Sequence, residues 1–267
     1  MNRFGIKKRL AKAFEILGIT RFYEKQLKRK YGNNYIRIVN YHNTEAEDVA
    51  NFMKQMEWFR KKYTNVSYEE FKQFLLGQMD FNDKPGIMLT FDDGLIGNYY
   101  NAYPVLKKYG FTGYFMCSSE LVGTRGYMSF EQLRELVDQG HVVGDHTATH
   151  HRMHESDTEE ILQKEIVSSK EALSKGCGCE IDIFCWCGGE EEHYTRKAHE
   201  LITKTGYKYS FLTNSEPVIH NTNPFAIQRS NIEASWPLSL VRLQLCGFMD
   251  AHFKNKRLRV NQKLIIE

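Results

Sequence analysis

The chain has little proline and no long apolar run. Five prolines occur among 267 residues, and no proline-, glycine- or serine-rich linker divides the chain. No segment approaches the roughly 18 consecutive apolar residues that indicate a membrane-spanning helix. The N-terminus also lacks the apolar stretch and small-residue cleavage site of a secretion signal. Low-complexity tracts and internal repeats are absent as well. We therefore expect a folded protein in the cytoplasm.

Cysteine is present, but its pattern does not indicate a disulfide framework. Six cysteines in 267 residues, without a secretion signal, are typical of free thiols. Four of them form the pattern C-x-C-x5-C-x-C: Cys177, Cys179, Cys185 and Cys187. Structural zinc sites usually show C-x2-C spacing. Free thiols are therefore the preferred interpretation, and a four-thiolate metal site is the alternative.

Charge is distributed unevenly along the chain. The net charge is +3, but residues 1–31 contain ten Lys or Arg and two Glu, and ten minus two leaves a local charge of +8. Apolar residues at loosely helical spacing accompany these charges, so we predict a basic amphipathic helix in an N-terminal extension, residues 1–34. Such a helix can lie peripherally on an anionic membrane surface, or it can pack on the remaining protein or a partner subunit. A nucleic-acid partner is not expected, because no aromatic–basic binding pattern accompanies the segment.

Residues 35–267 alternate between short apolar runs and stretches of helical period. Seven runs rich in β-branched and aromatic residues are candidate strands: 36–42, 86–91, 112–117, 141–146, 182–187, 207–213 and 226–232. Capping-box pairs and glycines mark helix starts and ends between them: Ser129 with Gln132, Ser156 with Glu159, Gly110 and Gly140. Strands that alternate with helices without a linker predict an α/β fold, a single-domain deformed (β/α)7 TIM-like barrel.

In such a barrel, functional side chains lie where the strands end and the βα loops converge. Chemically active or aromatic residues occupy those positions in the predicted strands: His42, Asp92, Asp93, His146, Trp186 with Gly188, Thr213 and Arg229. Several of them are residue types that bind metals.

The stretch TFDDG, residues 90–94, places two carboxylates side by side. Downstream, HTATH sets His146 and His150 four residues apart, so in a first helical turn both rings would lie on one face and reach one cation. Two imidazoles, one carboxylate and an open position suit catalytic zinc, and also iron, cobalt or nickel. With Asp93 as the carboxylate ligand, Asp92 stays free to take a proton from a water whose pKa the cation lowers toward about 7.

The two motifs and their surroundings resemble the polysaccharide deacetylases of carbohydrate esterase family 4, which share the nodulation-type (NodB) homology domain. The stretches VNYHNT, YPVLKKYGFTGYFM, MSFEQLRELVDQGHVVGDHT and EIVSSKEALSK extend the similarity from residue 36 to about residue 250. The resemblance implies a deformed (β/α) barrel that uses a divalent metal to hydrolyse acetyl groups on sugar polymers. It implies Asp92 as catalytic base and Asp93, His146 and His150 as metal ligands.

Further residues follow from the same resemblance. Arg229 would pair with Asp92 and orient the base. His42, Trp186 and Gly188 would contact substrate, although Cys187 stands where the family has proline. The family's last motif, a leucine followed by any one residue and then a histidine, has no counterpart near the C-terminus. This leaves the general acid unassigned, with His193, His220 and His252 as candidates.

The sequence thus predicts a zinc-dependent deacetylase, with cobalt or nickel as alternative metals. We expect it to act on an N-acetylated sugar, in a precursor of a surface polysaccharide or glycolipid, in the cytoplasm or at the inner membrane surface. The alternative is a metal-containing carbohydrate-binding protein with impaired catalysis, which the cysteine at the proline position and the missing acid favour.

Overall fold

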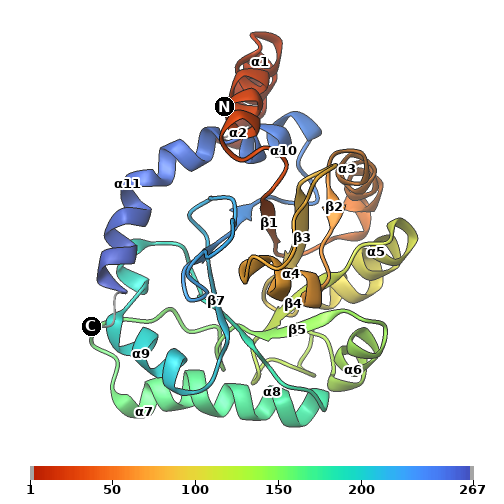
Figure 1. Ribbon diagram of the computed structural model, residues 1–267. Coiled ribbons are helices and arrows are strands. Elements are labelled where there is room, and N and C mark those ends of the chain that lie inside the picture. Colours follow the sequence, from red (N-terminus) through yellow and green to blue (C-terminus); the bar gives the residue numbers. More distant parts are fainter. Residues whose placement is uncertain (1–2, 265–267) are drawn as a thin grey trace.

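The computed structural model describes residues 3–264, in which parallel strands form a nearly closed barrel surrounded by helices (Figure 1). The strands are β1 (Ile36–Tyr41), β2 (Thr64–Asn65), β3 (Gly86–Phe91), β4 (Gly113–Cys117), β5 (Val142–Asp145), β6 (Ile183–Cys185), β7 (Tyr209–Leu212), β8 (Ile227–Gln228) and β9 (Ser230–Asn231). Their order is β8-β7-β6-β5-β4-β3-β1-β9, and β2 pairs with β3. All seven predicted strands occur, and the TIM-like barrel is confirmed. The two-residue β2 was not predicted.

The last predicted strand closes the barrel from both sides. Its first half, β8, pairs with β7, and its second half, β9, pairs with β1. Arg229 lies between the two halves and donates its backbone N–H to the carbonyl of Leu212 on β7. Arg229 therefore lies at the seam where the last predicted strand joins β7 to β1.

The helices alternate with the strands along the chain. They are α1 (Arg3–Ile16), α2 (Ile19–Tyr31), α3 (Val49–Lys62), α4 (Tyr68–Leu75), α5 (Tyr103–Tyr109), α6 (Phe130–Asp138), α7 (Glu159–Leu162), α8 (Ser169–Cys177), α9 (Arg196–Lys204), α10 (Leu238–Leu245) and α11 (Phe248–Lys263). Short π-helical segments precede α5 (Asn98–Ala102) and join α7 to α8 (Gln163–Ser168). Among residues 3–264, no helix has the length and apolar character needed to cross a membrane.

Helix ends were predicted with mixed success. The Ser129–Gln132 capping box is present at the start of α6, and Gly110 ends α5 in the left-handed conformation. The predicted capping box at Ser156 is wrong. Helix α7 begins two residues later, because the side chain of Thr158 accepts the backbone N–H of Ile161.

The strands are apolar on both faces because they separate two apolar layers. Alternate residues point inward, such as Ile36 and Ile38 of β1, and pack on Phe71 and Phe74 of α4, which closes the barrel where the strands begin. The outward residues pack against the surrounding helices. The end where the strands finish lacks such a plug in the described chain and holds a polar cavity.

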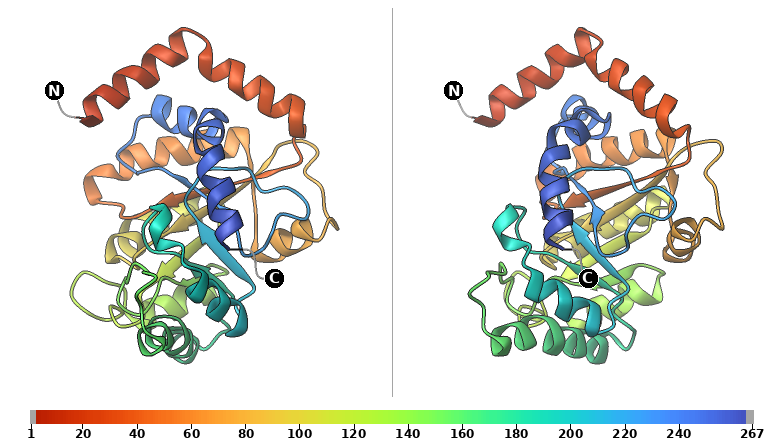
Figure 2. Two further views of the ribbon diagram at one scale, coloured as in Figure 1. Left: turned by 90° about the vertical axis from the view of Figure 1, so that its left-hand side faces the viewer. Right: turned by 60° about the vertical axis from the view of Figure 1, so that its left-hand side comes forward.

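Helices α1 and α2 stand outside this barrel, next to α10 and α11 (Figures 1 and 2). The predicted single N-terminal helix is therefore two helices, with Gly18 between them at a φ of 74°. Ala11 of α1 packs with Leu240 and Leu243 of α10, so this segment is docked on the barrel domain.

Candidate active site

A cavity of about 360 Å³ opens at the C-terminal ends of the strands. Its lining includes eight residues that the sequence singled out: His42, Asp92, Asp93, His146, His150, Trp186, Gly188 and Thr213. Arg229 lies immediately behind Asp92 and is fully buried. The rule that chemistry gathers at the strand ends therefore located one site from residues spread over most of the chain.

Asp93 lies in a sharp turn directly after β3. Asp93 and Gly94 both have a φ of 72°, a conformation that aspartate tolerates better than most side chains. The turn allows the two neighbouring carboxylates to have different partners. Asp92 meets Arg229, whereas Asp93 meets the imidazoles of His146 and His150.

Three potential ligand groups converge at Asp93. Its Oδ1 lies 3.5 Å from Nε2 of His146 and 3.2 Å from Nε2 of His150. Burial disfavours the charged carboxylate, but the two imidazoles outweigh burial, and the pKa of Asp93 is lowered from its ordinary value. The same Oδ1 is buried and has no hydrogen-bond partner with acceptable geometry among the described residues. A cation between the three groups would satisfy this oxygen, so the residues fit a metal site.

The orientation of His146 supports this interpretation. Its Nδ1 lies 2.9 Å from the carbonyl oxygen of Cys185, so the ring donates a hydrogen bond there. In the neutral ring, the Nε2 that faces Asp93 would then carry the lone pair that a metal ligand needs. The backbone N–H of His146 donates to the carbonyl of Cys117, which anchors the residue at the end of β5.

His150 reaches the site by a different route from the one predicted. Residues 146–150 form a loop and not the first turn of a helix, and both Thr147 and His150 have positive φ values (63° and 61°). The loop is held by Thr147 Oγ1, which accepts the N–H of His151, and by the buried Glu165, which accepts two hydrogen bonds from Thr149. Both rings reach Asp93 as the spacing led us to expect, but the predicted helical turn is wrong.

Asp92 forms a buried, bidentate ion pair with Arg229. The guanidinium donates from Nη1 to Oδ1 at 2.6 Å and from Nη2 to Oδ2 at 2.8 Å. Burial raises the pKa of Asp92, but Arg229 outweighs it, so the pKa of this carboxyl is lowered from its ordinary value. Arg229 is itself positioned by Thr90 Oγ1 at 2.9 Å and by Asn40 Oδ1. Asp92 is therefore ionised and fixed at the edge of the cavity.

His42 has a partner that sequence reasoning missed. Its Nδ1 lies 3.0 Å from Oε1 of Glu233, and this hydrogen bond raises the pKa of the imidazole above its ordinary value. Of the three imidazoles that line the cavity, His42 is the one outside the Asp93 cluster. The available signal was the position of both residues, since His42 follows β1 and Glu233 follows the neighbouring β9.

The three histidines proposed as general acid lie elsewhere. His220 contacts the ring of Phe74 of α4 and Asp80, near the opposite end of the barrel. His193 and His252 are absent from the cavity lining. None of the three imidazoles therefore lines this cavity.

Trp186 and Gly188 line the cavity, and Cys187 lies between them in the chain. Trp186 is buried, and its Nε1 donates to Ser210 Oγ at 2.7 Å. Cys187 is buried behind the cavity and bonds to the carbonyl of His146 at 3.3 Å. Its sulfur, together with His146 and His150, forms another group that could hold a metal, and so does Cys185 with Asp92 and His146.

The four cysteines do not form one site in residues 3–264. Cys177 and Cys179 lie before β6, whereas Cys185 ends it and Cys187 follows. No group of potential ligands in this range contains Cys177 or Cys179. All six cysteines are free, as the sequence indicated.

The chain is similar to one protein family and to several individual proteins. The model of the polysaccharide deacetylase family matches residues 80–210, which include Asp92, Asp93, His146 and His150. A Bacillus subtilis relative, YxkH, whose name assigns it provisionally to the polysaccharide deacetylases, is 27% identical over 182 residues. The alignment covers 68% of this chain and 63% of YxkH, so it spans less than two thirds of the relative.

Solved structures share the same architecture. The Streptococcus pyogenes deacetylase PplD in complex with acetate has a TM-score of 0.69 at 22% identity, over 79% of this chain and 98% of that chain. A polysaccharide deacetylase from Bacillus cereus has a TM-score of 0.66 at 22% identity, over 79% of this chain and 69% of that chain. At such identities the similarity establishes the fold.

Proposed function

Because this chain belongs to the polysaccharide deacetylase family, we propose that it is a metal-dependent hydrolase that removes the acetyl group from an N-acetylated sugar. One observation carries the proposal. An ionised carboxylate, Asp92, is held by Arg229 next to the cluster of Asp93, His146 and His150, and all but Arg229 line one cavity. A free base beside potential metal ligands is the arrangement that hydrolysis of an unactivated amide needs.

The residues divide the reaction between them. Asp93, His146 and His150 would hold a divalent cation, which supplies polarisation of the acetyl carbonyl and a lower pKa for the attacking water. Asp92 removes a proton from that water, while Arg229 keeps the carboxylate ionised and oriented. His42, paired with Glu233, donates a proton to the sugar nitrogen as the carbon–nitrogen bond breaks. The products are acetate and the free amine.

The finer identity of the metal and substrate belongs to the same proposal. Two imidazoles and a carboxylate favour zinc, and cobalt or nickel fits the same ligands. We propose a precursor of a surface polysaccharide or glycolipid as substrate, on the cytoplasmic side of the membrane. The competing proposal is a carbohydrate-binding protein with impaired catalysis. The Asp92–Arg229 ion pair favours the enzyme, because a binding protein has no need of a fixed free base.

The first test measures metal content and acetate release together. We expect about one zinc, cobalt or nickel per chain and acetate release from N-acetylated oligosaccharides. His150→Ala should lose the metal, whereas the control His154→Ala should retain it, since His154 is exposed and outside the cavity. Metal without acetate release would favour the binding protein. Absence of metal in the unsubstituted protein would overturn the proposal.

The role of His42 has a separate test. His42→Gln should slow release from an N-acetyl sugar about 10²–10⁴-fold. Hydrolysis of 4-nitrophenyl acetate should change little, because its leaving group departs without protonation. Equal losses on the two substrates would contradict the assignment of His42 as proton donor.

A further inference from the structure

Helices α1 and α2 form an arch on the outside of the barrel (Figure 2). Its inner side is packed on the last two helices. The rings of Phe14 and Tyr23 contact Phe248 of α11 at centroid distances of 5.6 and 5.3 Å, and Arg242 of α10 pairs with Glu15. These contacts hold the arch on the barrel through its inner side.

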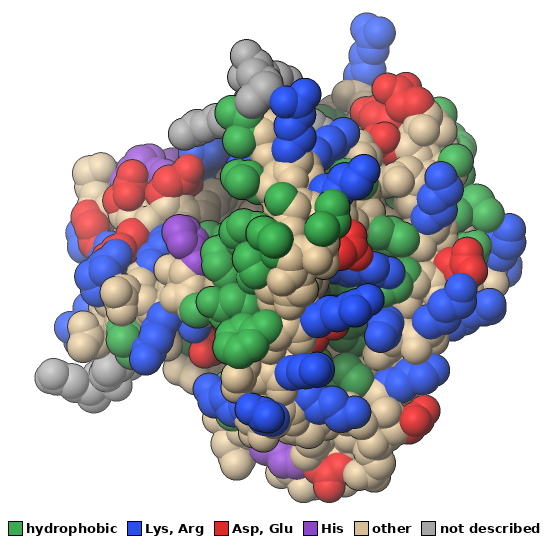
Figure 3. All heavy atoms as spheres, turned by 90° about the horizontal axis from the view of Figure 1, so that it is seen from above, with side chains coloured by type: hydrophobic (Ala, Val, Ile, Leu, Met, Phe, Trp, Pro, Cys, Tyr) green, Lys and Arg blue, Asp and Glu red, His purple; other side chains and the backbone are tan. Residues whose placement is uncertain are grey.

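The outer side of this arch carries an unusual share of exposed apolar surface. Ten large hydrophobic side chains are exposed in the described chain, and five of them belong to the arch: Ile6, Leu10, Ile16, Leu17 and Phe22. The three nearest the bend at Gly18 are the most exposed of these, with Ile16 at 76%, Leu17 at 72% and Phe22 at 56%. Figure 3 looks onto the arch from above and shows hydrophobic side chains grouped at its centre, among Lys and Arg. The apolar group therefore lies on the convex bend.

Positive charge surrounds this group. Nine Lys or Arg side chains on the arch are exposed: Lys7, Lys8, Arg9, Lys12, Arg21, Lys25, Lys28, Arg29 and Lys30. Two acidic residues accompany them, and one of these, Glu15, is paired with Arg242. On α2, Phe22 shares its outward face with Lys25 and Arg29, which follow it at helical spacing. An apolar group flanked by charges of one sign is typical of helices that bind anionic lipid surfaces.

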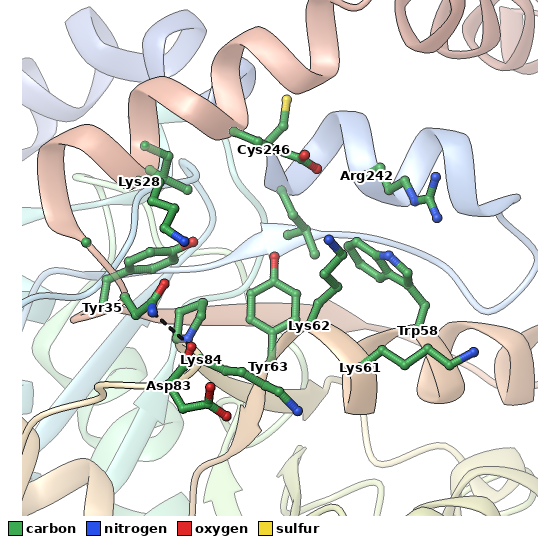
Figure 4. A pocket seen from close by; sticks show the side chains of 16 residues that line it. Lys28, Tyr35, Trp58, Lys61, Lys62, Tyr63, Asp83, Lys84, Arg242 and Cys246 are labelled. Atoms are coloured by element: carbon green, nitrogen blue, oxygen red, sulfur yellow. Dashed lines mark hydrogen bonds between the residues drawn. The ribbon is translucent and has the colours of Figure 1, made fainter.

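The positive surface continues under α2. A cavity of about 410 Å³ lies between α2, α3 and α10 (Figure 4). Five basic side chains line it: Lys28, Lys61, Lys62, Lys84 and Arg242. Glu24 and Asp83 also line it, and two of the basic side chains have acidic partners, Arg242 with Glu15 and Lys61 with Glu57. Lys28, Lys62 and Lys84 thus place further positive charge beside the arch.

We propose that the arch docks the protein on an anionic phospholipid membrane. The side chains of Ile16, Leu17 and Phe22 enter the boundary between headgroups and acyl chains, and the flanking Lys and Arg contact lipid phosphates. A membrane fits better than a second copy of the chain, because the bend is convex and its charges would repel those of an identical surface. This inference goes beyond the proposed hydrolysis and does not depend on it.

The test measures vesicle flotation of the full chain. We expect the protein to float with vesicles that contain phosphatidylglycerol, to float poorly with phosphatidylcholine alone, and to dissociate as salt is raised. The double variant Leu17→Ser/Phe22→Ser should lower the membrane partition coefficient at least about tenfold. Its matched control is Leu76→Ser/Leu258→Ser, which removes two side chains that are 68% and 53% exposed outside the arch.

A second pair of variants tests the charges. Lys25→Gln/Arg29→Gln should weaken binding to anionic vesicles, whereas Lys175→Gln/Lys204→Gln, exposed on α8 and α9, should not. Circular dichroism of each variant establishes that it is folded. Absence of flotation on anionic vesicles, equal losses in arch and control variants, or binding to duplex DNA in preference to lipid would each overturn the proposal.

Discussion

Two buried Arg–Asp pairs of nearly identical geometry lie in different regions of this protein. Arg229 and Asp92 pair inside the barrel at distances of 2.6 and 2.8 Å, beside the cavity. Arg37 of β1 and Asp250 of α11 pair outside it, at 2.8 and 2.6 Å. Both guanidinium groups are fully buried, and both leave Nε–H without a partner among the described residues.

The electrostatics of the two arginines is also alike. Burial lowers the pKa of each guanidinium, but the paired carboxylate outweighs burial, so both pKa values are raised above the ordinary value. The two ion pairs differ in the residues that surround each aspartate. Asp92 lines a cavity with three potential metal ligands, whereas Asp250 accepts a hydrogen bond from Ser215 and ties α11 to the barrel. The same ion pair can thus fix a carboxylate at the edge of a cavity or join two elements, and its surroundings decide which.

The two ion pairs should differ most when the aspartate of each is replaced by the neutral asparagine. Asp92→Asn is expected to retain metal and to slow acetate release about 10²–10⁴-fold, because it removes the base. It also leaves Arg229 buried without a counter-charge. Elemental analysis and acetate release on the same preparation check this. Turnover at the normal rate would contradict the role assigned to Asp92.

Asp250→Asn should affect stability alone. Removing one partner of a buried ion pair typically lowers the free energy of unfolding by about 3–5 kcal/mol, here because Arg37 keeps its buried charge. The rate of acetate release per folded molecule should stay within about twofold of the unsubstituted rate, because substitutions away from a site usually have small effects. Urea denaturation measures the loss, and Asp138→Asn, exposed at the end of α6, is the control. A large fall in turnover would mean that the two regions are coupled.

Replacing each arginine by lysine keeps the positive charge, so it tests the hydrogen-bond geometry of each ion pair. Lysine cannot form the two parallel hydrogen bonds of a guanidinium. Arg229→Lys should therefore misplace the Asp92 carboxylate and lower turnover by about 10²-fold, with little change in KM. Arg37→Lys should cost about 1–3 kcal/mol of stability and leave turnover unchanged. Steady-state kinetics and urea denaturation of both variants distinguish these outcomes.

The sequence predicted the barrel well because the physical signal was local. Parallel strands packed on both faces appear as short apolar runs, and the residues after them share one end of the barrel. This located Asp92, Asp93 and His146 without any knowledge of tertiary contacts. The Asp92–Arg229 ion pair, which the family resemblance implied, is present as well.

The parts that sequence reasoning missed depend on contacts between distant residues. Glu233 pairs with His42 across 191 positions, and Asp250 pairs with Arg37 across 213, through closure of the barrel and docking of α11. The spacing of His146 and His150 indicated a helical turn, but tertiary contacts of the loop override that preference. Local pattern thus predicts which residue types gather at the site, and not which partners fix their protonation.

The smallest expected effects come from one hydroxyl beside each pair. Thr90 Oγ1 accepts a hydrogen bond from Arg229 and donates one to the carbonyl of Val39, while Ser215 Oγ donates to Asp250 Oδ1 at 2.9 Å. Thr90→Val and Ser215→Ala should each lower the free energy of unfolding by about 1 kcal/mol.

Turnover should separate the two hydroxyl variants. Thr90→Val should slow acetate release by less than about tenfold, because the bidentate bonds from Arg229 to Asp92 remain. Ser215→Ala should leave the rate unchanged, since Arg37 and Ser215, which bond to Asp250, do not line the cavity at the strand ends. Equal rates for both variants would show that Thr90 does not help to position the base. A slower Ser215→Ala would mean instead that the outer ion pair supports the active site through the β9 seam, where Ser215 contacts Ser230.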